Sequence, residues 1–68
     1  MKMIRVTRMG RSVIQGEDAV IYLAVKSINY VTKDEVGHTK IIMHRGAIIV
    51  EENAMEIIKA IDTAWITA

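Results

Sequence analysis

Residues 38–68 constrain the fold most, because they contain a complete β-hairpin followed by a capped amphipathic helix. Two β-rich runs, residues 39–44 and 47–50, flank the dipeptide Arg45-Gly46. The glycine of this dipeptide can adopt the positive φ that a tight two-residue turn requires. No side chain in this segment has an obvious catalytic partner, so we interpret it as structural.

Side chains alternate between the two faces of such a hairpin. In the expected register His44 pairs with Ala47, and Ile42 pairs with Ile49. One face then carries Thr39, Ile41, Met43, Ile48 and Val50. Ile42 and Ile49 lie on the opposite face, so both faces of the hairpin are partly apolar.

The helix that follows can cover only one of these faces. Asn53 is a favourable N-cap, and Glu56 three residues later completes a capping-box pattern. The expected apolar stripe consists of Ala54, Ile57, Ile58, Ile61, Ala64 and Trp65. Because one stripe covers one face, Ile42 and Ile49 remain on the far face unless the sheet curls on itself or meets another subunit. We predict that they form an interface between copies of the chain.

The first half of the chain predicts more sheet. Residues 3–8 form a strand with Ile4 and Val6 on one face, and a turn around Gly10 leads to residues 12–15 as its candidate return strand. Residues 19–25 are all apolar without alternation, which favours burial on both faces. Residues 27–32 are a strand that either continues the preceding one past a bend near Lys26-Ser27 or pairs beside it.

Together these elements predict a single small α+β domain over residues 1–68, with a mostly antiparallel sheet of four to five strands and one C-terminal amphipathic helix. A chain of this size buries only about 60% of its unfolded surface. The sequence has no cysteine, no proline and no zinc-ligand pattern. Association between copies is then the remaining common route to stability, so we expect a homo-oligomer.

The apolar segments are too short for a membrane. No run approaches the roughly 20 residues that span a bilayer, and the N-terminus lacks the apolar region of a signal peptide. We therefore expect a cytoplasmic protein without a membrane partner.

Basic residues cluster at the N-terminus, where Lys2, Arg5, Arg8 and Arg11 precede the first acid. They favour either a phosphate contact, to which Arg45 would add, or a solvated edge strand protected by charge. Arg5 and Arg8 point to opposite faces of an ideal strand and do not form one stripe. We therefore interpret the cluster as a protected edge.

The sequence offers little for catalysis or metal binding. The adjacent acids of residues 17–18, 34–35 and 51–52 fall at turns or at the helix start, where such residues are common. His38 and His44, six residues apart on one strand, would be separated by about 20 Å, too far to share one ion. The glycines do not form a phosphate-binding loop. We expect no enzyme, no cofactor and no metal site.

Both ends of the chain resemble a known family. The segment of residues 3–10 reads MIRVTRMG, and the later part contains Thr39-x-Ile41-x-Met43, Gly46, Val50 and a Glu-initiated helix. These features resemble the short bacterial flagellar and swarming motility protein family known as FlbD. The resemblance covers about half of the chain. It implies a cytoplasmic, non-enzymatic accessory role and carries no catalytic residues over.

We therefore expect a non-catalytic binding or regulatory module that acts as a homo-oligomer, of the flagellar or motility accessory type. The alternative is an oligomeric protein of bacterial or phage origin that binds single-stranded nucleic acid or a nucleotide. In that alternative the arginines Arg5, Arg8, Arg11 and Arg45 contact phosphates, and Tyr22, Tyr30 or Trp65 provides a stacking surface.

Overall fold

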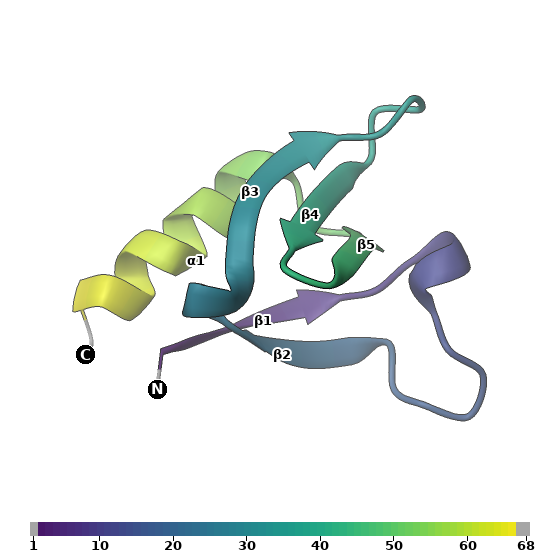
Figure 1. Cartoon of the computed structure of the whole chain (residues 1–68), viewed down its shortest axis with the longest axis horizontal. Coiled ribbons are helices and arrows are strands. Elements are labelled where there is room, and N and C mark those ends of the chain that lie inside the picture. Colours follow the sequence, from purple (N-terminus) through teal and green to yellow (C-terminus); the bar gives the residue numbers. More distant parts are fainter. Residues whose placement is uncertain (1, 67–68) are drawn as a thin grey trace.

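The computed structural model describes the backbone of residues 2–66 and the side chains of residues 2–63. Within this range the fold is α+β, as the sequence predicts: two small antiparallel sheets and one C-terminal helix (Figure 1). The elements in chain order are β1 (Met3–Thr7), η1 (Gly10–Ser12), β2 (Val20–Ala24), η2 (Val25–Ser27), β3 (Ile28–Lys33), β4 (Thr39–Met43), β5 (Gly46–Val50) and α1 (Ala54–Ile66). The η elements are single 3₁₀ turns.

Strand β1 pairs with β2 in an unbroken antiparallel register. Ile4 and Val6 lie on one face of β1 as predicted, and this face is buried in the core. The predicted return strand at residues 12–15 is wrong, because the chain turns through η1 and a loop before β2 pairs with β1. Gly10 has φ 59°, a left-handed value that glycine adopts without strain, and it starts that turn.

Strand β2 continues into β3 through η2, so the bend near Lys26-Ser27 is confirmed and the side-by-side alternative is not. Figure 1 shows the chain turning from β2 up into β3 at this bend. The prediction that residues 19–25 are buried on both faces is wrong. Tyr22 is exposed, and the other residues of β2 are half-buried. The reason is that β2 is an edge strand, which among the described residues pairs with β1 alone.

The β4–β5 hairpin forms as predicted, but its register is shifted by two residues. Met43 pairs with Gly46 and Ile42 with Ala47, so the turn residues are His44 and Arg45. Because side chains alternate with a period of two, this shift leaves every residue on the face that the sequence predicts. Ile41 is buried in the core, whereas Ile42 and Ile49 lie on the outer face of the sheet.

The two sheets join where β1 ends beside β5. Arg8 and Val50 form an antiparallel bridge. Around it, the Met9 N–H donates to the Ile49 carbonyl at 3.0 Å and the Glu51 N–H donates to the Thr7 carbonyl at 2.8 Å. The five strands therefore wrap around one core, whose buried hydrophobic residues are Ile4, Val6, Val25, Ile41, Val50 and Ile57.

Helix α1 packs against β1 and β3. Asn53 caps it as predicted, since its Oδ1 accepts the Glu56 N–H at 2.8 Å. The buried stripe differs from the prediction: Ile57 is fully buried, Ala60 and Ile61 are half-buried, and Ile58 is exposed. The helix is rotated so that the small Ala60 faces the sheet, and the predicted stripe residues Ala64 and Trp65 lie beyond the described side chains.

Glu52 ties the start of α1 to the end of β1. Its Oε1 accepts the Thr7 N–H at 2.9 Å, and its Oε2 accepts the Thr7 hydroxyl at 2.9 Å. Desolvation raises the pKa of the Glu52 carboxyl, but the hydrogen bonds from Thr7, the Glu52 N–H and the charge of Arg5 outweigh it, so the pKa is lowered from its usual 4.5.

We expect Glu52→Gln to destabilise the protein by about 1 to 2 kcal/mol at neutral pH, because hydrogen bonds to a charged group are lost. A lowered folded pKa adds stability that is present above pH 4.5 and is lost as the pH falls through the folded value. The difference between variant and unmodified protein should therefore shrink in acid. Urea unfolding between pH 3 and 7 measures it. The matched control is Glu51→Gln, at an exposed side chain next to Glu52; an equal loss there would contradict the assignment.

Candidate binding groove

A groove among the described residues lies between η1 and the loop that joins β3 to β4. Its volume is about 600 Å³. Its lining residues are Met9, Gly10, Arg11, Lys33, Asp34, Glu35, Val36, His38, Lys40 and Ile49. Met9, Val36 and Ile49 supply apolar surface, and charges of both signs surround them. Such a mixture fits a polypeptide surface better than a single highly charged ligand.

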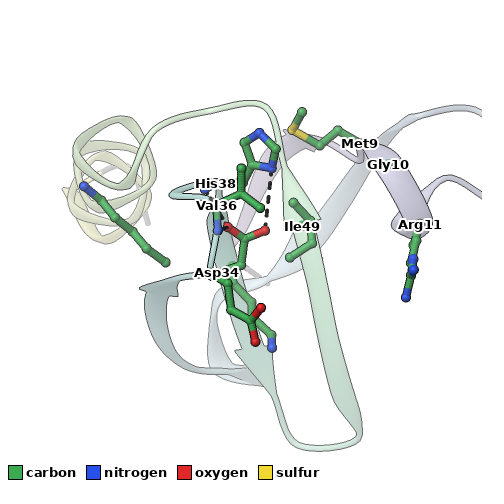
Figure 2. A pocket seen from close by; sticks show the side chains of 10 residues that line it. Met9, Gly10, Arg11, Asp34, Val36, His38 and Ile49 are labelled. Carbon is green, nitrogen blue, oxygen red and sulfur yellow. Dashed lines mark hydrogen bonds and ion pairs between the residues drawn. The ribbon is translucent and has the colours of Figure 1, made fainter.

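Asp34 organises one wall of this groove. Its Oδ1 accepts the N–H groups of Val36 at 3.0 Å and His38 at 2.8 Å. Its Oδ2 lies 3.5 Å from Nδ1 of His38, the contact drawn dashed in Figure 2. Gly37 completes the loop with φ 98°, which favours glycine. The loop is thus held by local hydrogen bonds and presents Val36 to solvent.

The hydrogen bonds within this loop also set the charge of Asp34. Desolvation raises the pKa of its carboxyl, but hydrogen bonds from the loop backbone, led by that of His38, outweigh this effect. The pKa of Asp34 therefore lies below its usual 3.8, and the group is a carboxylate at neutral pH. Asp34 with a glycine three residues later is a recognisable turn signal, but it does not reveal that the loop faces η1.

The opposite wall is η1, which is anchored on the edge of β5. The Ile49 N–H donates to the Ser12 hydroxyl at 2.7 Å, and the Ile49 carbonyl accepts the Met9 N–H. In Figure 2 Met9 and Ile49 lie near the Asp34–His38 loop, and Arg11 stands at the far side. Sequence reasoning missed this wall because Ser12 and Ile49 are distant in the chain.

The two residues predicted for an oligomer interface have different surroundings. Ile49 lines the groove and is half-buried, and it pairs across the strands with Lys40. Ile42 is also half-buried and lies between Tyr30 and Ala47 in the sheet. We call the surface formed by Tyr30, Ile42, Ala47 and Ile49 the outer face. It is apolar, but its two isoleucines are partly covered by neighbours within the chain.

The four arginines singled out in the sequence come from separate places. Arg5 points outward from β1 opposite Tyr22, Arg11 is on η1, and Arg45 is in the β4–β5 turn. Arg8 is only 7% exposed. Of these four arginines only Arg11 lines the groove. The predicted interface residue Ile49 also lines it.

Arg8 is engaged within the fold. Its Nη2 donates to the Asp18 carbonyl, and its Nη1 lies 3.5 Å from Oε2 of Glu17. Its Nε is buried and has no hydrogen-bond partner. This guanidinium ties the loop after η1 to the junction of the two sheets, and it is not presented to a surface ligand.

The candidate stacking residues are also dispersed. Tyr22 is 62% exposed on β2, and Tyr30 is 58% exposed on the outer face. The side chain of Trp65 lies outside the described residues. Tyr22 and Tyr30 belong to different sheets, so neither extends a row of aromatic side chains along a common groove.

The lining of the groove contains one histidine–carboxylate pair. Among its lining residues the His38–Asp34 pair has no serine, threonine or cysteine beside it that it could activate. No group of three or more histidine, cysteine, aspartate or glutamate side chains is placed to hold a metal within the described part of the chain.

Comparison with known proteins adds no relative: no family model matches the chain, and neither a curated protein nor a solved structure is similar to it at a significant level. In the part of the chain that the structure describes, no helix combines the length and the apolar character that crossing a bilayer requires.

Proposed function

We propose that the chain is a small, non-catalytic binding module of the cytoplasm that works as a homo-oligomer. The observation that supports this most is the distribution of apolar side chains. Among the described residues six hydrophobic side chains are buried, whereas eight large ones are exposed. The exposed set includes Met3, Tyr22, Tyr30, Met55 and Ile58, which come from strands and the helix. So much apolar surface on so small a core favours burial against another chain.

The groove and the outer face supply the partner-binding part of this proposal. The groove combines apolar Met9, Val36 and Ile49 with charges of both signs, which suits a polypeptide partner. The resemblance of both ends of the chain to the FlbD family supports an accessory role of the motility type.

The alternative, binding of single-stranded nucleic acid, has weaker support, because Arg8 is engaged inside the fold and the other arginines do not converge.

We expect the purified chain at tens of micromolar to sediment with at least twice the 7.6 kDa mass of one chain. The physical reason is that association would bury the large hydrophobic side chains that are exposed on one chain. Sedimentation velocity or light scattering across a dilution series measures the mass. A monomer throughout that range would contradict the proposal.

The alternative function has its own signature. Binding of an oligonucleotide that weakens steeply with salt, and that is lost in an Arg5→Gln/Arg11→Gln variant, would favour the nucleic-acid binder over the adaptor. Arg8 is left unchanged in this variant, because its replacement would disturb the fold as well as the surface charge.

A further inference from the structure

The outer edge of β2 is open along its whole length. β2 is paired on one side with β1, and no other strand of residues 2–66 pairs with its far side. One backbone hydrogen bond lies at each end of the β1–β2 pairing. The Arg8 N–H donates to the Ala19 carbonyl at 2.7 Å, and the Val25 N–H donates to the Lys2 carbonyl at 2.9 Å. These bonds determine which backbone groups of β2 face β1.

Hydrogen-bonded and non-hydrogen-bonded pairs alternate in an antiparallel ladder. Ile21 and Leu23, two and four residues beyond Ala19, therefore direct their backbone groups toward β1. Val20, Tyr22 and Ala24 direct their N–H and C=O groups away from the molecule. They form a regular row of donors and acceptors, ready to pair with another strand.

The outer edges of β1, β3 and β5 are each interrupted. On β1 the Thr7 N–H donates to Oε1 of Glu52, and the Thr7 carbonyl accepts the Glu51 N–H. The register of β3 shifts between Ile28 and Tyr30, and the strand ends in Lys33. The edge of β5 is occupied at Ile49, whose N–H and carbonyl are bonded to η1 and its N-cap. A bulge, a terminal lysine and a covering segment are the usual means of blocking edge pairing. β2 has none of these and contains no charged residue.

The side chains of β2 favour further burial as well. Ile21 and Leu23 pack against the core cluster but remain half-exposed, since no strand lies beyond them. Tyr22 points outward and is 62% exposed. A strand added at this edge would cover all three residues. The sequence predicts that residues 19–25 are buried on both faces, and the added strand would increase the burial of this apolar segment.

We propose that a second copy of this chain pairs with the β2 edge, antiparallel and about a two-fold axis at Tyr22. In this register Tyr22 lies opposite Tyr22 of the second copy, and Val20 lies opposite Ala24. All the outward-facing backbone groups of β2 then find partners. The inference rests on the proposed homo-oligomer and names the surface through which it forms.

Charge complementarity selects this register over its neighbours. Asp18 precedes β2 and Lys26 follows it, and both side chains are exposed. Pairing centred on Tyr22 brings each Asp18 near Lys26 of the other copy. A slip of two residues in either direction loses this match. On the outward face, Arg5 lies opposite Tyr22, so the joined sheets place two tyrosine rings between two guanidinium groups, a favourable cation–π arrangement.

This pairing uses no residue of the outer face and none of the residues that line the groove. Self-association and partner binding then use separate surfaces. Ile42 and Ile49 are assigned to the surface that meets a different partner.

Two substitutions at Tyr22 test the proposed interface between the β2 strands of two copies, here called the β2 seam. Tyr22→Lys places like charges opposite each other across the two-fold axis. Tyr22→Pro removes an outward N–H that β1 does not use, so proline is tolerated there as on other edge strands. We expect both variants to sediment as monomers at concentrations where the unmodified chain is associated, with circular dichroism unchanged. Should Tyr22→Pro fail to fold, Tyr22→Lys decides alone, since its side chain is exposed.

Two controls separate this inference from the proposed function. Tyr30→Lys changes the same residue type at similar exposure on the outer face, and Ile49→Lys charges the interface predicted from the sequence. Both should remain associated. If Ile49→Lys dissociates the oligomer and Tyr22→Lys does not, the β2 seam is overturned while the homo-oligomer stands. A monomeric unmodified chain would overturn both.

A charge exchange tests the register itself. Asp18→Lys should weaken association roughly tenfold, because two facing pairs become repulsive. The backbone carbonyl of Asp18 that binds Arg8 is unaffected by this change. Adding Lys26→Asp restores opposite charges and should recover the original dissociation constant. Lack of recovery in the folded double variant would contradict pairing centred on Tyr22.

Discussion

Ile57→Ala is expected to lower the free energy of unfolding by about 2 to 5 kcal/mol. Ile57 is only 1% exposed and belongs to the core cluster beneath α1. Truncation would leave a cavity that the short strands around it cannot close. A domain of this size has about 3 to 10 kcal/mol of total stability, so this one change removes a large share and lowers the melting temperature by about 8 °C or more.

Ile58→Ala is the matched control, because it is the same substitution at the next residue of the same helix. Ile58 is 47% exposed, so its truncation should cost less than about 1 kcal/mol. Urea unfolding followed by circular dichroism measures both, at one protein concentration because the proposed association would also stabilise the fold. Equal costs for the two variants would mean that α1 presents the stripe predicted from the sequence instead.

This pair of residues shows where helical periodicity stops being informative. The sequence correctly predicts the N-cap at Asn53 and the buried role of Ile57. It places Ile58 in the stripe as well, because isoleucine is more hydrophobic than Ala60 on the other side. The helix instead turns the small Ala60 toward the sheet. The rotation of a helix depends on the shape of the surface beneath it, which no single helix sequence contains.

The hairpin shows that side-chain alternation in a β-strand preserves the predicted faces even when the predicted register is wrong. Its turn lies at His44 and Arg45 instead of Arg45 and Gly46, so the predicted pairing is wrong. The faces are nevertheless right, since a shift of two residues moves no side chain across the sheet. Ile42 and Ile49 are on the outer face, as the alternation predicts, but how much neighbours cover them depends on tertiary packing.

The groove could not be predicted, because its walls come from distant parts of the chain. The turn at Asp34 and the turn at Gly10 are each visible locally as breaker patterns. Their approach depends on the junction of the two sheets at Arg8 and Val50 and on the bond from the Ile49 N–H to the Ser12 hydroxyl. Long-range pairings of this kind leave no mark in a single sequence.

Arg8→Gln is the second change with a large expected effect. Arg8 directly follows β1 and is buried, and its guanidinium donates to the Asp18 carbonyl and approaches Glu17. Glutamine carries no charge and is too short to hold this loop. We expect a loss of about 1.5 to 3 kcal/mol, the range for hydrogen bonds that involve a charged group. The unpaired Nε of Arg8 partly offsets the loss, because its burial is itself costly.

Arg5→Gln is the control, since Arg5 lies three residues earlier, is exposed on β1 and faces outward. Its replacement should change the stability by less than about 1 kcal/mol. Thermal and urea unfolding of the two variants separate a buried structural arginine from a surface one. If Arg8→Gln is as stable as Arg5→Gln, the Arg8 guanidinium is free, and a phosphate-binding role for the N-terminal arginines regains its basis. If Arg8→Gln is destabilised as expected, loss of ligand binding in that variant cannot be taken as a phosphate contact, because folding is impaired.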